Sequence, residues 1–413
     1  MQTHSSAATT VAHPWLAVVA VALATFSVVT TEMLPVGLLT PIAQDLASSA
    51  GNAGLLISAP ALLAALFAPM VVIAAGGINR RRILCGLLML LVVANAASAL
   101  APNMAWMLAA RLLVGVCMGG IWAIAGGLAI RLVVAQRVGL ATAIIFGGVA
   151  AASVLGVPLG AWIGELFGWR QAFAGMALLS TLVLLLHVAV IPSLPVTASI
   201  QLRHFAGQLR NRQVLLGLGL TLLLVTGHFA AFTYVRPLLE LVSGVDTAWI
   251  GGLLLAYGIA GIVGNFLVGL IAPRNVSAAV IAIAAGLLAT SILFLSVGDA
   301  PLHGGLLLLL WGLAYGGVSV GLMTWMMQAA AKPTKPGSES GFVPKPDSDP
   351  GLAIEVNSAL YVGAFNVGIA LGAWAGGRLL DQVGLGGNLS ATAVLAATAL
   401  LLCIASMVCG RRC

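Results

Sequence analysis

Twelve long apolar runs follow one another along the chain, and they constrain the fold more than any other feature. Each is close to the roughly 20 residues that cross the hydrocarbon core of a bilayer. In lipid, only helices and closed barrels satisfy every backbone polar group, and these runs lack the two-residue alternation of a barrel strand. We therefore predict an all-α membrane protein with twelve transmembrane helices. The runs lie near 15–39, 53–77, 83–101, 105–130, 138–163, 170–192, 213–241, 247–272, 276–298, 302–330, 353–380 and 389–409.

The composition leaves little room for another class of protein. Of the 413 residues, 61% are hydrophobic and 7% are charged, against about 25% charged in a soluble domain. The 18 Lys+Arg exceed the 11 Asp+Glu, but the bases lie in loops between apolar runs, which indicates membrane topology rather than nucleic-acid binding. No lysine belongs to a phosphate-binding loop, and no CxxC pair suggests a disulfide or a zinc site. We expect no enzyme activity, cofactor, metal or nucleic-acid partner. The cysteines are Cys85, Cys117, Cys403, Cys409 and Cys413.

Basic residues gather in alternate loops, and this predicts the orientation of the chain. Loops rich in Lys and Arg lie in the cytoplasm. The side of the two termini carries fourteen bases and the opposite side three, at Arg170, Arg236 and Arg378. We therefore expect both termini to be cytoplasmic, and the first run to be retained as a span because it lacks a cleavage site. The fourteen are Arg80, Arg81, Arg82, Arg131, Arg137, Arg203, Arg210, Arg212, Arg274, Lys332, Lys335, Lys345, Arg411 and Arg412.

Two longer interruptions divide the chain. The linker 193–212 separates an N-terminal half, residues 1–192, from a C-terminal half, residues 213–413. The segment 332–350, rich in Pro, Ser and Gly, is expected to be a flexible cytoplasmic loop. Short strings repeat at matching spans: LGAW occurs at 159–162 and at 371–374, and a GxxxGG string begins at Gly115 and at Gly312. These matches predict two six-helix pseudo-symmetric halves with a solute site between them near the membrane midplane.

Glu32 is the most informative single residue. It lies about 12 Å inside the outer end of the first run at 1.5 Å per residue, where a carboxylate costs about 2.5–3.5 kcal/mol. We predict that it carries a proton; the alternative is a structural partner for a buried base. Arg111 lies at a similar depth in the fourth run. The two residues are expected to pair, and protonation of Glu32 or solute binding would then release Arg111; the alternative is a fixed packing ion pair.

Polar and aromatic side chains provide candidate solute contacts. His228 lies near the middle of the seventh run, where a histidine could sense protons, bind a solute or bond a neighbouring backbone group. Arg236 and Glu240 are four residues apart and would also pair at a helix end. Further aromatics, Phe146, Tyr257, Tyr361 and Phe365, either line the same cavity or face core and lipid. The candidate solute contacts are His228, Tyr234, Arg236, Trp122, Trp311, Tyr315 and Asn366.

Glycines recur at every fourth position in two of the runs. Such stripes let helices approach closely and slide, although ordinary close packing explains at least part of them. Pro158, Pro60 and Pro69 interrupt backbone hydrogen bonding at positions where a rocking fold would bend. The stripes comprise Gly148, Gly156, Gly160 and Gly164 in the fifth run, and Gly368, Gly372 and Gly376 in the eleventh.

Four segments resemble the major facilitator superfamily, in its twelve-span drug:proton antiporter branch. They are TTEMLPVGLLTPIAQDL at 30–46, NRRRIL at 79–84, RLLVGVCMGGIWAIAGGLAIRL at 111–132 and GVAAASVLGVPLGAWIGELFGWRQAF at 148–173. Within that branch, EMLP, GGIWA, GELFGWR, FTYVRP and WGLAYGGVSVG look most like purine ribonucleoside efflux permeases, with sugar efflux permeases close behind.

The resemblance implies the major facilitator fold and assigns roles to particular residues. It places the loop motif at Asn79, Arg80 and Arg81 and the span-four arginine at Arg111. The chain departs from the pattern where Asn79 replaces the usual Asp, which weakens a charge latch, and where Val157 replaces a small residue. The antiporter motif falls on Gly148, Gly156, Pro158 and Gly160.

The predicted function is proton-coupled efflux of a small polar solute, with a purine ribonucleoside as the leading candidate, and the resemblance implies a bacterial inner membrane. The resemblance implies that the proton gradient drives transport and that no cofactor is needed. Alternatives are a sugar (arabinose-like) exporter, a multidrug exporter and, least favoured, a non-transporting membrane sensor, which would need an effector domain. We expect a monomer.

Overall fold

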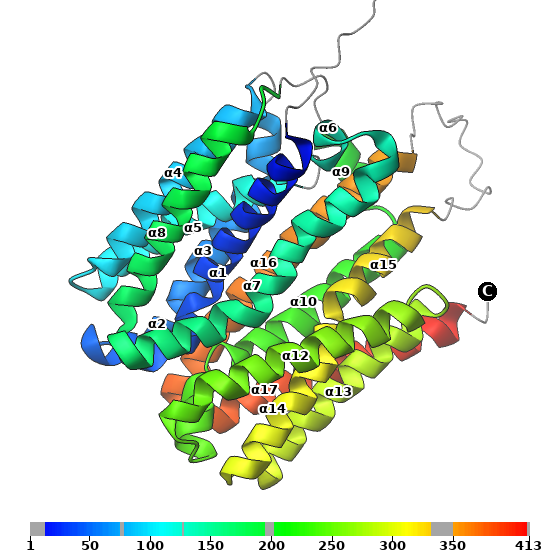
Figure 1. The fold of residues 1–413 in the computed structure, drawn as a ribbon. Coiled ribbons are helices and arrows are strands. Elements are labelled where there is room, and N and C mark those ends of the chain that lie inside the picture. Colours follow the sequence, from blue (N-terminus) through cyan, green and yellow to red (C-terminus); the bar gives the residue numbers. More distant parts are fainter. Residues whose placement is uncertain (1–12, 75–77, 126–127, 195–201, 332–349, 411–413) are drawn as a thin grey trace, which may run out of the picture.

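Helices make up most of the described chain. The computed structural model describes residues 13–74, 78–125, 128–194, 202–331 and 350–410 (Figure 1). The N-terminal half contains α1 (Pro14–Asp45), α2 (Ala50–Ala53), α3 (Leu55–Ala74), α4 (Arg80–Ala99), α5 (Met104–Ala125), α6 (Ala129–Leu132), η1 (Ala135–Arg137), α7 (Val138–Phe167) and α8 (Trp169–Val190). After α9 (Leu202–Gln208) come α10 (Arg212–Phe232), α11 (Val235–Pro237), η2 (Leu238–Val242), α12 (Thr247–Ile271), α13 (Val276–Val297), α14 (Pro301–Gly316), α15 (Val318–Ala331), α16 (Pro350–Val383) and α17 (Leu385–Gly410).

Twelve helical segments within the described residues are long and apolar enough to span a membrane, and this confirms the predicted fold class. Polar side chains begin several of them. Asn79, Asn211, Asp246 and Asn275 each accept a hydrogen bond from a backbone N–H in the first turn of α4, α10, α12 and α13. Such caps satisfy donors that the helix itself leaves free. The expected loop 332–350 lies, except for Pro350, outside the described residues, as do 195–201 of the linker and several of the counted bases.

Three of the predicted runs are interrupted in the structure. The second is divided at Gly54 into α2 and α3, and the tenth at Gly317 into α14 and α15. The seventh ends as an α-helix at Phe232 and continues through α11 into the π-helical turn η2. Pro237 lacks the N–H that would bond the carbonyl of Thr233, and this explains the break.

Close helix pairs relate the two halves by pseudo-symmetry. The glycines of α7 face α1: a Cβ at Gly156 would lie 3.2 Å from Thr30 Cα, and one at Gly160 or Gly164 would meet Leu34 or Leu38. The corresponding stripe of α16 faces α10, where Cβ atoms would meet Val225, Phe229 and Ala230. The close approach predicted from the glycine stripes therefore occurs in both halves, between their first and fifth membrane spans.

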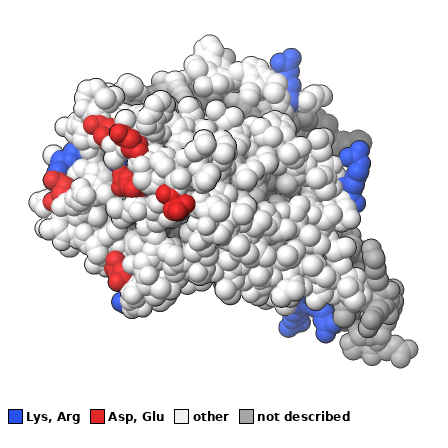
Figure 2. Space-filling view, turned by 90° about the horizontal axis from the view of Figure 1, so that it is seen from below, with Lys and Arg blue, Asp and Glu red and all other residues white. Residues whose placement is uncertain are grey.

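Acidic residues gather at one end of the bundle, where a few bases accompany them, and other basic residues lie at the opposite end (Figure 2). We call these the acidic end and the basic end. The acidic end carries Asp45, Glu165, Glu240, Asp246, Asp299 and Asp381, which lie at or beside helix ends on that side. The basic end carries Arg80, Arg81, Arg82, Arg131, Arg137, Arg210, Arg212 and Arg274.

The halves pack together toward the acidic end. The hydrophobic cluster that fills the C-terminal half also contains buried residues of α1, α2, α3 and α7. All of these lie in the parts of the N-terminal half near the acidic end: Val36, Leu39, Ala43, Ala53, Ile57, Ala61, Val157 and Ala161. Contact between α7 and α12 continues to the middle of the bundle, where Gly258 lies against Val154. The structure is therefore closed at its acidic end.

Candidate solute and coupling site

Arg111 binds main-chain carbonyls that prolines leave without a donor. Pro35 in α1 and Pro60 in α3 lack the N–H groups that would bond the carbonyls of Thr31 and Leu56. The guanidinium of Arg111, which is fully buried, donates to Thr31 O at 2.7 Å and to Leu56 O at 2.9 Å, and also to Glu32 O at 2.9 Å. One arginine on α5 thus joins two proline-containing helices of its own half.

Glu32 does not form the expected ion pair with Arg111. The ion pairs found among the described residues are Arg170–Asp45, Arg236–Glu165 and Arg236–Glu240. The carbonyls use the N–H groups of Arg111, and Glu32 Oε1 is buried with no hydrogen-bond partner in the described structure. Because α1 continues through Pro41 to Asp45, Glu32 also lies deeper than predicted, about 20 Å from the end of its helix at 1.5 Å per residue.

The carboxyl group of Glu32 lies on the side of α1 that meets the other half. Val36, Leu39 and Ala43 follow Glu32 at helical spacings of four, seven and eleven residues and so share its face. These three residues pack into the cluster of the C-terminal half. A buried carboxyl without a partner is costly. It therefore marks α1 near the interface of the halves as a place where a proton or a solute would bind favourably.

Four aromatic rings of the C-terminal half stack in a column. Tyr315 of α14 stacks on His228 of α10, with ring planes 7° apart. His228 stacks on Phe232 at 4.7 Å between centroids, and Phe232 on Tyr257 of α12 at 4.8 Å. Trp311 meets His228 edge to face. The column joins three helices, and its two end residues, Tyr315 and Tyr257, are partly exposed.

Trp311 fixes the protonation state of His228. The indole Nε1–H donates to His228 Nδ1 at 3.1 Å. An indole nitrogen is only a donor, so Nδ1 carries no proton while this bond exists, and the neutral ring holds its hydrogen on Nε2. In this arrangement Nε2 is free to donate a hydrogen bond to a solute, and proton sensing would require the bond to Trp311 to break.

Tyr234 and Arg236 lie away from the aromatic column, in the closed acidic end. The hydroxyl of Tyr234 donates to Ala373 O at 2.6 Å, and its ring is fully buried. Arg236 donates to Glu240 at 2.7 Å, to Gly37 O at 2.8 Å and to Glu165 at 3.4 Å. In this conformation both side chains bond to groups of the protein itself, and their assignment as solute contacts stays a prediction. The expected Arg236–Glu240 pair is present.

Carboxylates from equivalent helices tie the halves together at two places. Glu165 of α7 accepts from Arg236 and from Thr247, the first residue of α12. Asp381 of α16 accepts from Ser49 Oγ at 2.8 Å and from the N–H of Gly51 at 3.3 Å. In each case a carboxylate on the fifth span of one half accepts hydrogen bonds from residues at the start of the second span of the other half. We call these contacts the two carboxylate latches.

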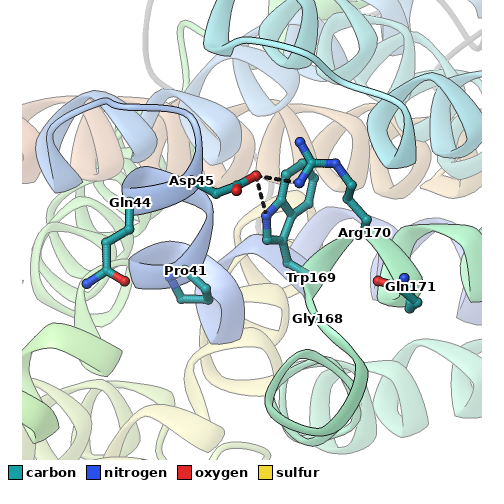
Figure 3. A pocket seen from close by; sticks show the side chains of 7 residues that line it. All are labelled: Pro41, Gln44, Asp45, Gly168, Trp169, Arg170 and Gln171. Carbon is teal, nitrogen blue, oxygen red and sulfur yellow. Dashed lines mark hydrogen bonds and ion pairs between the residues drawn. The ribbon is translucent and has the colours of Figure 1, made fainter.

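A surface pocket at the acidic end lies wholly within the N-terminal half (Figure 3). Asp45 accepts hydrogen bonds from Trp169 Nε1 and from Arg170, and the guanidinium of Arg170 lies over the Trp169 ring, 4.2 Å from its centroid. Arg170 also donates to Ala101 O at 3.1 Å. These contacts join the end of α1 to the start of α8.

The loop motif joins the start of α4 to the end of α8 and to the first residues of the linker. Asn79 Oδ1 accepts from the N–H groups of Arg81 and Leu194, both at 3.0 Å, and its amide donates to Ser193 Oγ at 2.6 Å. The Arg81 guanidinium donates to Val188 O, and the N–H of Arg80 donates to Leu194 O. Asn79 therefore provides the acceptors that the usual Asp would provide, without its charge.

The remaining candidate solute contacts are spread over both halves. Trp122 of α5 lies beside Phe146 in the N-terminal half, and Asn366 of α16 donates to Val362 of its own helix. Trp122 Nε1, the Tyr315 hydroxyl and Asn366 Oδ1 are buried and have no partner in the part of the chain described. The structure thus brings His228, Trp311 and Tyr315 together, whereas Trp122 lies in the other half.

Sequence reasoning missed the carboxylate latches and the partners of the two buried arginines. The signal for the latter was present, because each proline inside a span frees the carbonyl four residues earlier. Pro35, Pro60 and Pro41 free three of the four carbonyls that Arg111 and Arg236 bind, and the fourth is that of Glu32. No comparable pattern in the sequence marks Glu165 or Asp381 as contacts between the halves.

Comparison with known proteins identifies the family of the chain. The family model described as Major Facilitator Superfamily matches residues 21–343. The purine ribonucleoside efflux pump NepI of Salmonella typhimurium is 33% identical over 377 residues, which cover 91% of this chain and 90% of NepI. The transcription regulatory protein OpdE of Pseudomonas aeruginosa is 33% identical over 394 residues, which cover 94% of this chain and 93% of OpdE.

Solved transporter structures share the fold. The nucleoside transporter NupG has a TM-score of 0.71 at 14% sequence identity, with 95% of this chain and 98% of NupG covered. A bacterial homologue of the human lysosomal transporter Spinster, in an inward-facing and unoccupied conformation, also has a TM-score of 0.71, at 16% identity, with 95% of this chain and 94% of the homologue covered. The chain belongs to the major facilitator superfamily and is a multi-pass membrane transporter.

Proposed function

We propose that this protein exports purine ribonucleosides from the cytoplasm in exchange for protons, by alternating access between its two halves. The observation that carries the proposal is the Glu32 carboxyl, buried without a partner on the face of α1 that meets the C-terminal half. A carboxyl in that position would bind a proton from outside when the acidic end opens. It would release the proton to the aqueous phase on the other side when the basic end opens.

The aromatic column supports a planar solute. Stacking on an aromatic ring is worth about 1–3 kcal/mol for a nucleobase, and Tyr315 and Tyr257 close the two ends of the column. His228 offers an N–H, and Tyr315 and Asn366 bury polar atoms that lack partners in the described structure. Ribose hydroxyls and purine nitrogens are suitable partners for such groups. The naming of NepI as a purine ribonucleoside efflux pump supports the same solute class.

The positive-inside rule supports the direction of transport. We place the basic end in the cytoplasm and the acidic end outside, in a bacterial inner membrane with both termini cytoplasmic. The described conformation is then closed to the outside. One chain contains both halves, which supports action as a monomer. We propose that the proton gradient drives transport and that no cofactor takes part.

Export of labelled inosine from efflux-deficient cells tests the proposal. Cells that express the wild type should lose inosine faster than control cells, and a proton uncoupler or the substitution Glu32→Gln should abolish the difference. Asp299→Asn is the matched control, because Asp299 is an exposed acid at the acidic end. Absence of inosine export despite confirmed membrane expression would refute the nucleoside assignment, and arabinose and a drug panel would then distinguish the alternatives.

A further inference from the structure

Arg236 reaches across the interface to a main-chain atom of α1. Its Nη1 donates to Gly37 O at 2.8 Å, the carbonyl that Pro41 leaves without an intrahelical donor. The side chain is 6% exposed. The Glu240 carboxylate, which accepts from Arg236 Nε, also accepts from Thr40 of α1 at 3.0 Å. The opposite half therefore completes the hydrogen bonding of α1 where Pro41 leaves a carbonyl without a donor.

Two arginines thus hold α1 at proline-released carbonyls, and only one of them separates from α1 when the halves part. Arg111 belongs to the same half as α1 and binds the carbonyls of Thr31 and Glu32. Arg236 belongs to the other half and binds Gly37, five residues further along the helix. Opening of the acidic end keeps the first attachment and breaks the second.

The segment between the two attachments is the one that positions Glu32. Glu32 and Val36 share a helical face, and Val36 packs against the C-terminal half. When Arg236 leaves, Gly37 O loses its donor and α1 is free to change its bend at Pro41, because an unpaired main-chain carbonyl is relieved by water or by a local change of helix geometry.

We propose that Arg236 is a positioning residue that couples closure of the acidic end to the bend of α1 beyond Glu32, through the Gly37 carbonyl that Pro41 releases. The proposal rests on the alternating-access cycle proposed above and adds the element by which the gate and the coupling carboxyl act together. It assigns to Pro41 a role in transport: to leave a carbonyl that only the opposite half can satisfy.

Arg170 provides a matched control within the same molecule. It too lies at the acidic end, pairs with a carboxylate and donates to a main-chain carbonyl, Ala101 O. All of its partners belong to its own half. If Arg236 acted only as a surface ion pair or a general stabiliser, Arg170 and Arg236 would respond alike to conservative substitution.

The test measures how fast the acidic end opens. A single cysteine is introduced by Leu39→Cys in a cysteine-free full-length chain, because Leu39 is fully buried in the cluster shared by the halves. Maleimide labelling is followed in nanodiscs, with Trp249→Cys at an exposed position, 72% accessible, as the reference for complete labelling. Arg236→Lys, Pro41→Ala, their combination and Arg170→Lys are compared.

Arg236→Lys should raise the labelling rate about tenfold, since lysine cannot bind the three acceptors together and a charge-assisted hydrogen bond is lost. In the P41A background the same substitution should raise the rate less than about threefold, because Gly37 O then has a donor in its own helix. Pro41→Ala alone should also increase labelling, whereas Arg170→Lys should leave it unchanged.

Equal effects of Arg236→Lys on the labelling rate with and without Pro41→Ala would overturn the proposal. If the arginine variant fails to fold, an unchanged labelling rate in Pro41→Ala alone would also overturn it. Labelling requires no solute. A chain that exports no inosine but shows the expected labelling pattern would therefore refute the solute assignment and keep the role of Arg236. A chain that exports inosine but lacks the labelling pattern would refute the role of Arg236 and keep the solute assignment.

Discussion

The attachment of Arg111 to carbonyls rather than to Glu32 predicts opposite effects of two substitutions. In Arg111→Lys, one ammonium cannot reach carbonyls on both α1 and α3, so that Leu56 O or Thr31 O loses its donor. A buried polar group left unpaired costs about 1–3 kcal/mol. With the guanidinium geometry lost at two helices, the expected loss of stability is about 2–4 kcal/mol.

Glu32→Gln should behave differently. The Glu32 Oε1 atom has no hydrogen-bond partner among the described residues, so an amide of the same shape takes the place of the carboxyl without breaking a described hydrogen bond. Stability should stay within about 1 kcal/mol of the wild type or rise. If Glu32 and Arg111 formed a buried ion pair, removing one partner would cost about 3–5 kcal/mol.

Thermal unfolding of the purified full-length protein, followed by tryptophan fluorescence and size-exclusion chromatography, separates these cases. Arg274→Lys is the matched control, since Arg274 is exposed and donates to Leu270 O of its own helix. The reasoning predicts that Arg111→Lys melts several degrees below both Arg274→Lys and Glu32→Gln. Equal destabilisation by Glu32→Gln and Arg111→Lys would refute it and restore the ion pair.

Three further predictions follow from single contacts. Gly148→Val should destabilise the fold by about 1–3 kcal/mol and so reduce the yield of folded protein, because a Cβ there meets the backbone of α1. Gly147→Val should not, because nothing lies within 4 Å of its Cβ position. Membrane yield and monodispersity report the difference, and equal losses for the two variants would contradict the packing. Trp311→Phe should lower thermal stability by about 1–3 kcal/mol, since His228 Nδ1 loses its donor; an unchanged melting temperature would show that the bond contributes nothing. Asn79→Asp should keep export near the wild-type rate because both acceptor bonds survive, while Asn79→Leu should weaken the helix cap by about 0.5–2 kcal/mol; export assays and melting curves check both, and a loss in Asn79→Asp would show that the missing charge matters.

The sequence was sufficient for the fold because the bilayer imposes strong rules on local patterns. Long apolar runs can cross only as helices, and the glycine stripes near Gly156 and Gly372 identify the helix pairs that approach most closely. Breaks were less predictable. The divided seventh span depends on Pro237, whose effect on the helix could have been anticipated, and on a π-helical turn, which local propensity does not reveal.

The candidate site was only partly predictable, because depth in the membrane does not specify partners. Glu32 and Arg111 were identified by their burial cost, but the partners of Arg111 are set by prolines on two other helices. Arg236 was predicted to contact the solute or to pair with Glu240, and the tertiary arrangement also places Gly37 and Glu165 within its reach. Contacts between halves have no local sequence signal.

Proton movement in proteoliposomes tests the central claim most directly. Purified protein is reconstituted with a pH-sensitive dye in the lumen, and inosine is added outside. Exchange of inosine for protons predicts that the lumen becomes alkaline with the wild type. With Glu32→Gln the lumen pH should stay constant while labelled inosine still exchanges with unlabelled inosine. Inosine exchange by the wild type without any change of lumen pH, or equal alkalinisation by Glu32→Gln, would contradict proton coupling through Glu32.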